Sequence, residues 1–148
     1  MPKKEKIKIN SPIKKICTSC NPKKFLKFNF SFLKEYGKPK QEDVAQLFER
    51  LQFLSSEMYN VMLFKYQGNK KTFIEDIPVN QMDIKKEIPS GFRDSYPAET
   101  NEKYSIFRVY PAGKPNGTAN PRIIGMIKNT IFYIFYIDWN GDLYGHGK

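Results

Sequence analysis

The residues best suited to chemistry lie near the end of the chain, where Arg122, Tyr144 and His146 accompany strand-like segments. His146 is the only histidine in the sequence. A short closing strand that includes Leu143 and Tyr144 would place Tyr144 and His146 at the rim of a sheet, beside Arg122 on a neighbouring strand. No other grouping in the sequence combines a fixed cation with two side chains that can exchange protons in this way.

Two strand-like runs are expected to position this grouping. Residues 123–127 and 131–137 are rich in β-branched and aromatic side chains, and the short polar segment 128–130 separates them. This pattern predicts a β-hairpin. Asn140-Gly141 then predicts a tight turn, because both residue types tolerate positive φ.

The segment 138–142 (DWNGD) begins like a calcium-binding loop, but its glycine comes too early in the motif. The sequence also ends before the glutamate that such a loop requires. We therefore interpret this segment as a turn stabilised by aspartate or asparagine side chains, and we expect no metal site here.

The N-terminal half predicts a strand followed by a long helix. Phe28, Phe30 and Phe32 alternate with other residues within Phe25–Leu33, which is typical of a half-buried strand. A helix is expected from Gln41 to about Tyr66, ending at Gly68-Asn69. Its expected core stripe has three- and four-residue spacing and comprises Val44, Leu47, Phe48, Leu51, Leu54, Met58, Val61 and Met62.

The remaining segments complete an α+β fold. Residues 70–79 contain a possible third strand, and residues 81–100 resemble a long irregular connection. Tyr104–Tyr110 predicts another strand, with Tyr104, Ile106 and Arg108 on one face, and residues 112–121 form a turn region before the final hairpin. We expect one long amphipathic helix packed on a mostly antiparallel sheet, with the strand order left open.

The formal net charge of +10 is concentrated at the N-terminus, because the first 40 residues contain twelve lysines and only two glutamates. We expect a lysine-rich N-terminal arm at 1–22 and a single α+β domain at 23–148. Lysine favours diffuse attraction to phosphate, as in RNA, DNA, the ribosome or an anionic membrane, over the reading of bases. A solvated tail without a partner is the alternative. The candidate nucleic-acid-binding residues are Lys3, Lys4, Lys6, Lys8, Lys14, Lys15, Lys23 and Lys24.

The sequence predicts no cofactor and no membrane association. It contains neither an apolar run long enough to span a bilayer nor the apolar core of a signal peptide, so a cytoplasmic location is expected. Cys17 and Cys20 form a C-x-x-C pair, but a structural zinc site requires four ligands. Two reduced thiols are the better interpretation, and a metal-linked dimer is the alternative.

The C-terminal succession of YSIFRVY, PRIIGMI, IFYIFYID and LYGH resembles the small bacterial RelE/YoeB-type ribonuclease toxins. The chain end is also similar to small uncharacterised phage and mobile-element proteins, a similarity that implies no activity. Toxins of the RelE/YoeB type cleave mRNA, usually on the ribosome, by attack of a ribose 2′-hydroxyl on the adjacent phosphate. The resemblance implies that Arg108 and Arg122 hold the phosphate and that Tyr144 or His146 transfers protons.

Two functions are consistent with these observations. The first is an RNA-interacting protein that acts as an endoribonuclease toxin of a toxin–antitoxin or phage-defence system, with RNA or the ribosome and an antitoxin as partners. The second is a non-enzymatic interaction module that binds a protein or nucleic acid through its basic arm or a sheet edge. In the second case, Arg108 and Arg122 would be solvated charges or ion-pair members on edge strands.

Overall fold

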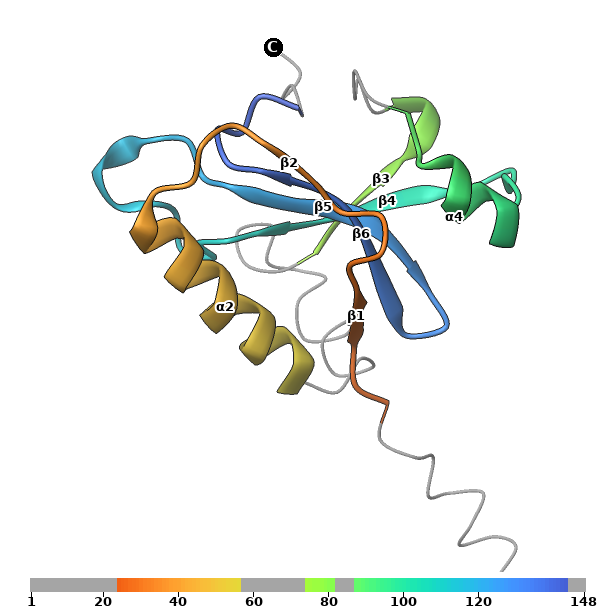
Figure 1. Ribbon diagram of the computed structural model, residues 1–148, viewed down its shortest axis with the longest axis horizontal. Coiled ribbons are helices and arrows are strands. Elements are labelled where there is room, and N and C mark those ends of the chain that lie inside the picture. Colours follow the sequence, from red (N-terminus) through yellow and green to blue (C-terminus); the bar gives the residue numbers. More distant parts are fainter. Residues whose placement is uncertain (1–23, 57–73, 82–86, 144–148) are drawn as a thin grey trace, which may run out of the picture.

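The computed structural model describes residues 24–56, 74–81 and 87–143. Its centre is a mixed sheet with the strand order β1-β6-β5-β4-β3, in which β2 also pairs with β6 (Figure 1). The pairs β3/β4, β4/β5 and β5/β6 are antiparallel, whereas β1 and β2 run parallel to β6. The strands are β1 (Lys27–Asn29), β2 (Lys34–Tyr36), β3 (Glu75–Pro78), β4 (Lys103–Arg108), β5 (Arg122–Lys128) and β6 (Ile131–Asp138).

The predicted C-terminal hairpin is present as β5 and β6. Lys128 pairs with Ile131, so Asn129 and Thr130 form a two-residue turn in which φ is 51° and 66°. Positive φ at both positions gives the turn a twist that matches the twist of the flanking strands. The backbone N–H of Lys27 donates to the carbonyl of Thr130 at 2.9 Å, which attaches β1 to the hairpin.

A register irregularity at Gly125 divides the hairpin into two parts. Ile124 pairs with Tyr136 and Gly125 pairs with Ile134, so Phe135 is the extra residue of a β-bulge. Strand alternation is interrupted there, and both Phe135 and Tyr136 belong to the same core cluster. A Cβ atom on Gly125 would lie 2.0 Å from the carbonyl oxygen of Tyr133, so only glycine fits this position.

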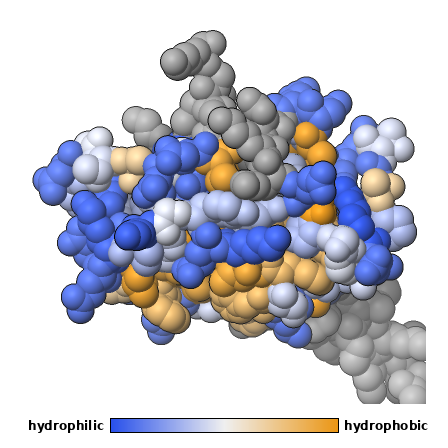
Figure 2. Space-filling model, turned by 45° about the horizontal axis from the view of Figure 1, so that its top comes forward, coloured by the Kyte–Doolittle hydropathy of each residue, from blue (hydrophilic) through white to orange (hydrophobic). Residues whose placement is uncertain are grey.

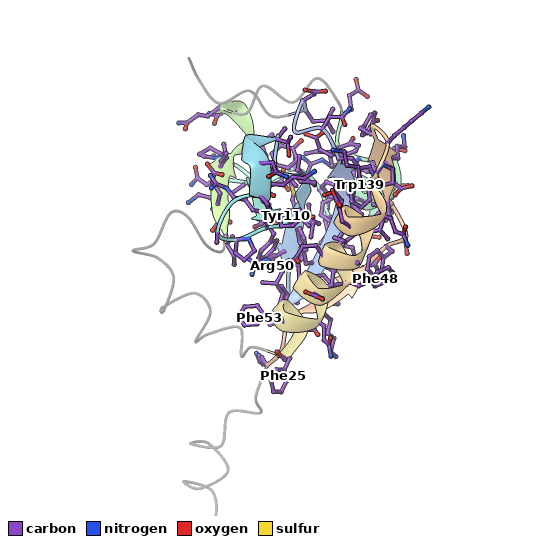
Figure 3. All side chains as sticks on the ribbon, turned by 90° about the vertical axis from the view of Figure 1, so that its left-hand side faces the viewer. Phe25, Phe48, Arg50, Phe53, Tyr110 and Trp139 are labelled. Carbon is purple, nitrogen blue, oxygen red and sulfur yellow. The ribbon has the colours of Figure 1, made fainter. Side chains whose placement is uncertain are left out.

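Helix α2 (Gln41–Ser56) covers one face of the sheet, as predicted (Figure 1). The core on this side includes Leu47 and Leu54 of the helix, together with Phe107, Ile123 and other strand residues. The prediction that Phe48 joins this core was wrong, because 68% of its surface is exposed. Phe48 and Arg50 lie on opposite sides of the helix, and Arg50 lies on the side nearer Tyr110 (Figure 3). The predicted end of the helix at Gly68-Asn69 lies outside the described residues.

The opposite face of the sheet is covered by α4 (Ser90–Ser95), a short helix that follows η1 (Val79–Gln81) and lies within a region expected to be irregular. Phe92 of α4 is fully buried and contacts Phe135 with a ring-centroid distance of 4.9 Å. The second core cluster lies here and comprises Phe92, Tyr104, Ile106, Ile124, Met126, Phe135, Tyr136 and Leu143. A further short helix, η2 (Pro115–Gly117), interrupts the turn region before β5.

Of the predicted strand at Phe25–Leu33, only β1 forms; a turn follows it, and β2 begins after Leu33. Phe28 packs against the core on the α2 side, whereas Phe32 packs against the core on the α4 side. Phe30 between them is 49% exposed. The three phenylalanines therefore do not share one face, because the turn ends the two-residue alternation after Asn29.

Hydrophobic side chains form a band along the lower part of the view in Figure 2, below a mostly hydrophilic area. The large hydrophobic residues that are exposed in the described part of the chain are Phe25, Phe30, Phe48 and Phe53. None of the helices among the described residues is long and apolar enough to cross a membrane. The N-terminal arm at 1–22, with Cys17 and Cys20, lies outside the described residues, so the expected arm and thiols stay predictions.

Candidate functional site

Arg108 and Arg122 lie directly opposite each other on adjacent strands. Arg108 of β4 pairs with Arg122 of β5, which pairs on its other side with Asp138 of β6. Asp138 is in turn in register with Tyr36 of β2. These four residues form a continuous row across four strands, and we refer to Arg108, Arg122, Asp138 and Tyr36 as the arginine row.

The arginine row lies on the face of the sheet that also carries α4. Ile106 and Ile124 are two residues away from Arg108 and Arg122 along their strands, and both belong to the core cluster on the α4 side. Side chains two residues apart in a strand share a face. The predicted grouping of Tyr104, Ile106 and Arg108 on one face agrees with this arrangement.

The surroundings of the two arginines differ from those expected of surface charges. The strands that carry them are in the interior of the sheet order, so the alternative placement on edge strands was wrong. Arg122 is buried, with 7% of its surface exposed, and Asp138 is 1% exposed. Arg108 is half-buried, which makes it the more accessible of the two cations.

The arginine row has a surplus of positive charge. Like charges directly opposite each other on paired strands are destabilising. Asp138 is adjacent to Arg122 and offsets one of the two cations, but in the described part of the chain no carboxylate forms an ion pair with Arg108. A bound anion at Arg108 would relieve the repulsion, and planar guanidinium groups are well suited to phosphate.

The last described residue is attached to the arginine row. The backbone N–H of Leu143 donates to Oδ2 of Asp138 at 2.8 Å, and Leu143 itself is buried in the core on the α4 side. This bond closes the turn at Asn140-Gly141, where Gly141 has the expected positive φ of 71°. The prediction that Leu143 belongs to a closing strand was wrong, because it forms part of a bend. Tyr144 and His146 lie outside the described residues.

Several hydrogen bonds hold the ends of the strands that carry the arginines. Arg50 of α2 is 3% exposed, and its Nε donates to the backbone carbonyl of Arg108 at 3.0 Å. Beyond β4, the side chain of Asn120 accepts from the backbone N–H of Tyr110 at 3.1 Å and donates to the carbonyl of Tyr110 at 2.6 Å. The connection between Arg108 and Arg122 is therefore closed near its base, which fixes the two strand ends relative to each other.

A buried carboxylate joins the same connection to α2. Asp43 is 2% exposed and accepts hydrogen bonds from the Tyr110 hydroxyl at 2.8 Å and from Lys114 Nζ at 3.0 Å. Burial alone would raise the pKa of Asp43, but the bonds from Lys114 and Tyr110 outweigh it and place this pKa below its usual value of 3.8. Burial, with a smaller effect of Asp43, raises the pKa of Tyr110 to about 12.

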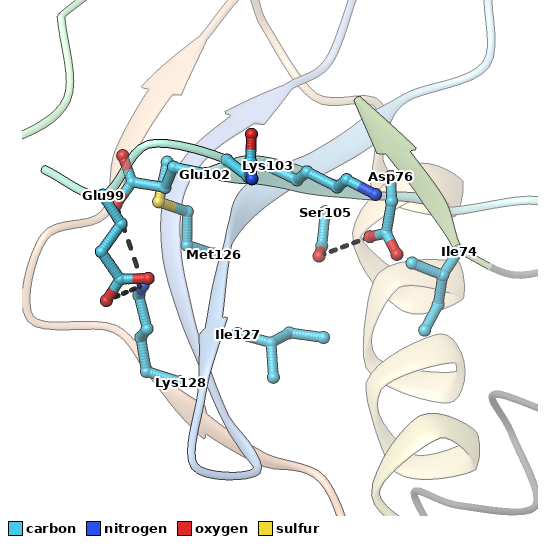
Figure 4. Close-up of a pocket in the computed structure, with 10 residues that line it drawn as sticks. Ile74, Asp76, Glu99, Glu102, Lys103, Ser105, Met126, Ile127 and Lys128 are labelled. Carbon is cyan, nitrogen blue, oxygen red and sulfur yellow. Dashed lines mark hydrogen bonds and ion pairs between the residues drawn. The ribbon is translucent and has the colours of Figure 1, made fainter. Parts of the chain in front are cut away.

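A separate cavity of about 220 Å³ opens near the junction of β3 and β4 (Figure 4). Its acidic residues already have partners. Asp76 accepts from the Ser105 hydroxyl at 2.8 Å, and Lys128 lies 3.3 Å from Glu99 and 3.8 Å from Glu102.

Glu102 also forms a two-pronged pair with Arg93 of α4, at 2.7 and 2.6 Å. Within the part of the chain that the structure describes, no group of three or more histidine, cysteine, aspartate or glutamate residues could hold a metal ion. We interpret the residues that line this cavity as part of a structural charge network, which holds α4 against the start of β4.

The structure thus brings together two of the four predicted catalytic residues, Arg108 and Arg122. Of the eight predicted lysines, only Lys24 is described, and it is exposed. Reasoning from the sequence missed Asp138 and Tyr36, which complete the row. Asp138 ends a strongly apolar strand and could have been suspected for that reason, whereas the parallel pairing of β2 with β6 left no local signal that would have selected Tyr36.

Comparisons with known proteins add no relative. The chain matches no protein-family model, and it has no match among curated proteins or among solved structures. The fold class is α+β, with a six-stranded mixed sheet and one main helix.

Proposed function

We propose that the protein is an RNA-binding endoribonuclease of the toxin type, with its phosphate site at Arg108 and Arg122. The observation that carries the proposal is the position of these two cations directly opposite each other, with a single adjacent carboxylate. Like charges repel in this arrangement, and an anion bound between or over the guanidinium groups would relieve the repulsion. Leu143, which directly precedes Tyr144 in the sequence, also donates a hydrogen bond to Asp138 of the arginine row.

In the proposed reaction, the ribose 2′-hydroxyl attacks the adjacent phosphorus. One of Tyr144 and His146 accepts the proton of the 2′-hydroxyl, and the other donates a proton to the leaving 5′-oxygen. The new bond joins O2′ to phosphorus and the bond from phosphorus to O5′ breaks, which yields a cyclic 2′,3′-phosphate and a free 5′-hydroxyl. Arg108 and Arg122 stabilise the negative charge that increases on the phosphoryl oxygens.

The proposed setting is the cytoplasm, with the lysines of segment 1–24 attracting RNA or the ribosome through their charge. A protein of this activity requires control, so an antitoxin or another protein partner is part of the proposal. Binding through these lysines should weaken steeply as the salt concentration rises, because each neutralised phosphate releases condensed counterions.

The test is tightly controlled expression in bacteria, with growth and primer extension on abundant mRNAs measured in the same cultures. We expect the wild type to arrest growth and to create new mRNA ends, whereas Arg108→Gln and His146→Ala should do neither. Lys103→Gln is the matched control, because it removes an exposed cation from the same strand as Arg108. Growth arrest with new mRNA ends in both Arg108→Gln and His146→Ala would refute the proposed site.

A non-enzymatic interaction module is the second candidate, and the exposed phenylalanines favour it. Phe48 is 68% and Phe30 is 49% exposed, although both belong to apolar patterns that were expected to be core. Exposed aromatic side chains are common anchors at protein interfaces. Intact mRNA and unaffected growth on wild-type expression would favour this candidate over the ribonuclease.

A further inference from the structure

A cavity of about 530 Å³ borders the arginine row on the α4 side. Tyr36 belongs both to the row and to the wall of this cavity. The other lining residues come from β2, from β6 and from the segment that enters α4, and they are Lys34, Glu87, Ile88, Pro89, Ser90 and Tyr136. The cavity and the phosphate site proposed above are therefore neighbours on one face of the sheet.

The distance between the two sites suits a single nucleotide. Tyr36 and Arg122 lie on either side of Asp138 in the row, and paired strands are about 4.8 Å apart. Their backbones are thus separated by two strand spacings, roughly 10 Å. A ligand with a phosphate at Arg122 and Arg108 can place a flat ring near Tyr36, as a nucleotide does when its base is turned away from its phosphate.

The wall of the cavity is aromatic and held firmly in place. Tyr136 is 2% exposed, and its hydroxyl donates a hydrogen bond to the backbone carbonyl of Glu87. The rings of Tyr36 and Tyr136 are 5.5 Å apart and tilted by 59°. Tyr36 is half-buried, and the ring of Tyr136 packs beside it. Aromatic rings of this kind are the usual platforms for unpaired bases.

The charged residues of the cavity define the ligand further. Lys34 is exposed and lies two residues before Tyr36 on β2, where an ammonium group can attract a phosphate that flanks a stacked base. Glu87 is also exposed, and its carboxylate can only accept hydrogen bonds. Guanine has two adjacent N–H donors on its pairing edge and suits such an acceptor better than uracil, whose single N–H lies between two carbonyl oxygens.

We propose that this cavity binds one unpaired base of single-stranded RNA, with a preference for guanine, next to the phosphate held by Arg108 and Arg122. This inference rests on the proposed function, because it assigns a base to the same RNA. Tyr36 provides the stacking surface, Lys34 attracts the neighbouring phosphate, and Glu87 accepts from the edge of the base.

The test measures binding of short 2′-O-methyl RNAs, which lack the attacking hydroxyl, to the full-length chain. Fluorescence anisotropy gives the affinity, and quenching of a 2-aminopurine placed within an oligouridine reports stacking. We expect Tyr36→Leu to weaken binding at least about fivefold and to abolish the quenching, whereas Tyr36→Phe should retain both. An oligouridine with one guanine should bind more tightly than oligouridine alone, and Glu87→Gln should reduce this difference.

Lys34→Gln is a second variant that does not disturb the core, because Lys34 is exposed. We expect it to lower the salt dependence of binding by about one counterion, while Lys103→Gln on the same sheet leaves the salt dependence unchanged. If Tyr36→Leu and Lys34→Gln bind like the wild type while Arg108→Gln binds weakly, the base site is refuted and the proposed function is retained. If the wild type binds none of these RNAs, both are refuted.

Discussion

Replacement of Lys114 by methionine should strongly destabilise the protein, because it would leave the carboxylate of Asp43 buried without its cation. The side chains of Asp43 and Lys114 are only 3% and 8% exposed, and their charged atoms are 2.9 Å apart. Removing one member of a buried pair costs about 3 to 5 kcal/mol. The hydroxyl of Tyr110 still donates to Asp43 in the variant, so we expect a loss near the lower end, about 3 kcal/mol.

A double-mutant cycle separates the pair from the two single changes. Asp43→Asn preserves the shape of the side chain and removes its charge, and the double variant Asp43→Asn with Lys114→Met contains no isolated charge. We expect the double variant to be more stable than the sum of the single losses predicts, by about 2 kcal/mol. The free energies of unfolding would be measured by urea denaturation at neutral pH.

The pH dependence gives an independent check with a defined sign. The pKa of Asp43 in the folded protein lies below its usual value of 3.8, so its stabilising effect is fully present above that value. The effect is lost as the pH falls through the lower folded pKa. In Lys114→Met this part of the acid destabilisation should disappear. A loss below about 1 kcal/mol, as for exposed ion pairs, together with unchanged acid sensitivity, would refute the reasoning.

Two further predictions concern the sheet. Gly125→Ala should cost at least about 3 kcal/mol in thermal unfolding, because the added Cβ would overlap the carbonyl of Tyr133. The control Gly113→Ala has open space around it and should lose only about 1 kcal/mol through its positive φ. Equal losses in the two variants would contradict this view of the bulge. Burial raises the pKa of Tyr104 to about 12, so the free energy of unfolding should fall as the pH rises from 10 towards 12. Tyr104→Phe should reduce that fall by about 2 to 3 kcal/mol in urea denaturation. The same fall with pH in the variant and the wild type would count against this prediction.

The C-terminal hairpin could be predicted from the sequence because its signals are local. Two apolar runs flank a short polar segment, and neighbouring residues in the sequence form the strand pairs. The bulge at Phe135 could not be predicted, because the continuous apolar run 131–137 fits a regular strand equally well. Its cause is visible only in three dimensions, where Gly125 lies against the backbone of Tyr133.

Periodicity was less reliable where tertiary contacts decide which side chains are buried. The spacing of Phe48 agrees with the apolar stripe of α2, yet Phe48 is exposed and the polar residues Asp43 and Arg50 are buried in its place. These two side chains can be buried because Asp43 binds Tyr110 and Lys114, and Arg50 binds the carbonyl of Arg108. Such partners are about 60 to 70 residues away in the sequence, and no window of periodicity includes them.

The candidate site shows the same division between local and distant information. The residue types of Arg108 and Arg122 could be selected from the sequence, but their direct opposition depends on the register of β4 with β5. Asp138 and Tyr36 belong to the row because β6 pairs with β5 on one side and with β2 on the other. A parallel pairing across about one hundred residues gives no local signal, and for this reason Tyr36 could not be selected from the sequence.

The two polar clusters near this end of the sheet differ in their charge balance. Asp43, Tyr110 and Lys114 form a closed set, in which one anion is matched by one cation and both carboxylate oxygens have donors. The arginine row contains two cations and one carboxylate, and in the described residues Arg108 lacks an ion-pair partner. A cluster that serves only stability gains from balanced charge, because an uncompensated buried charge is costly. The charge imbalance at Arg108 and Arg122 is therefore the reason why the phosphate site is proposed there and not at the Asp43 cluster.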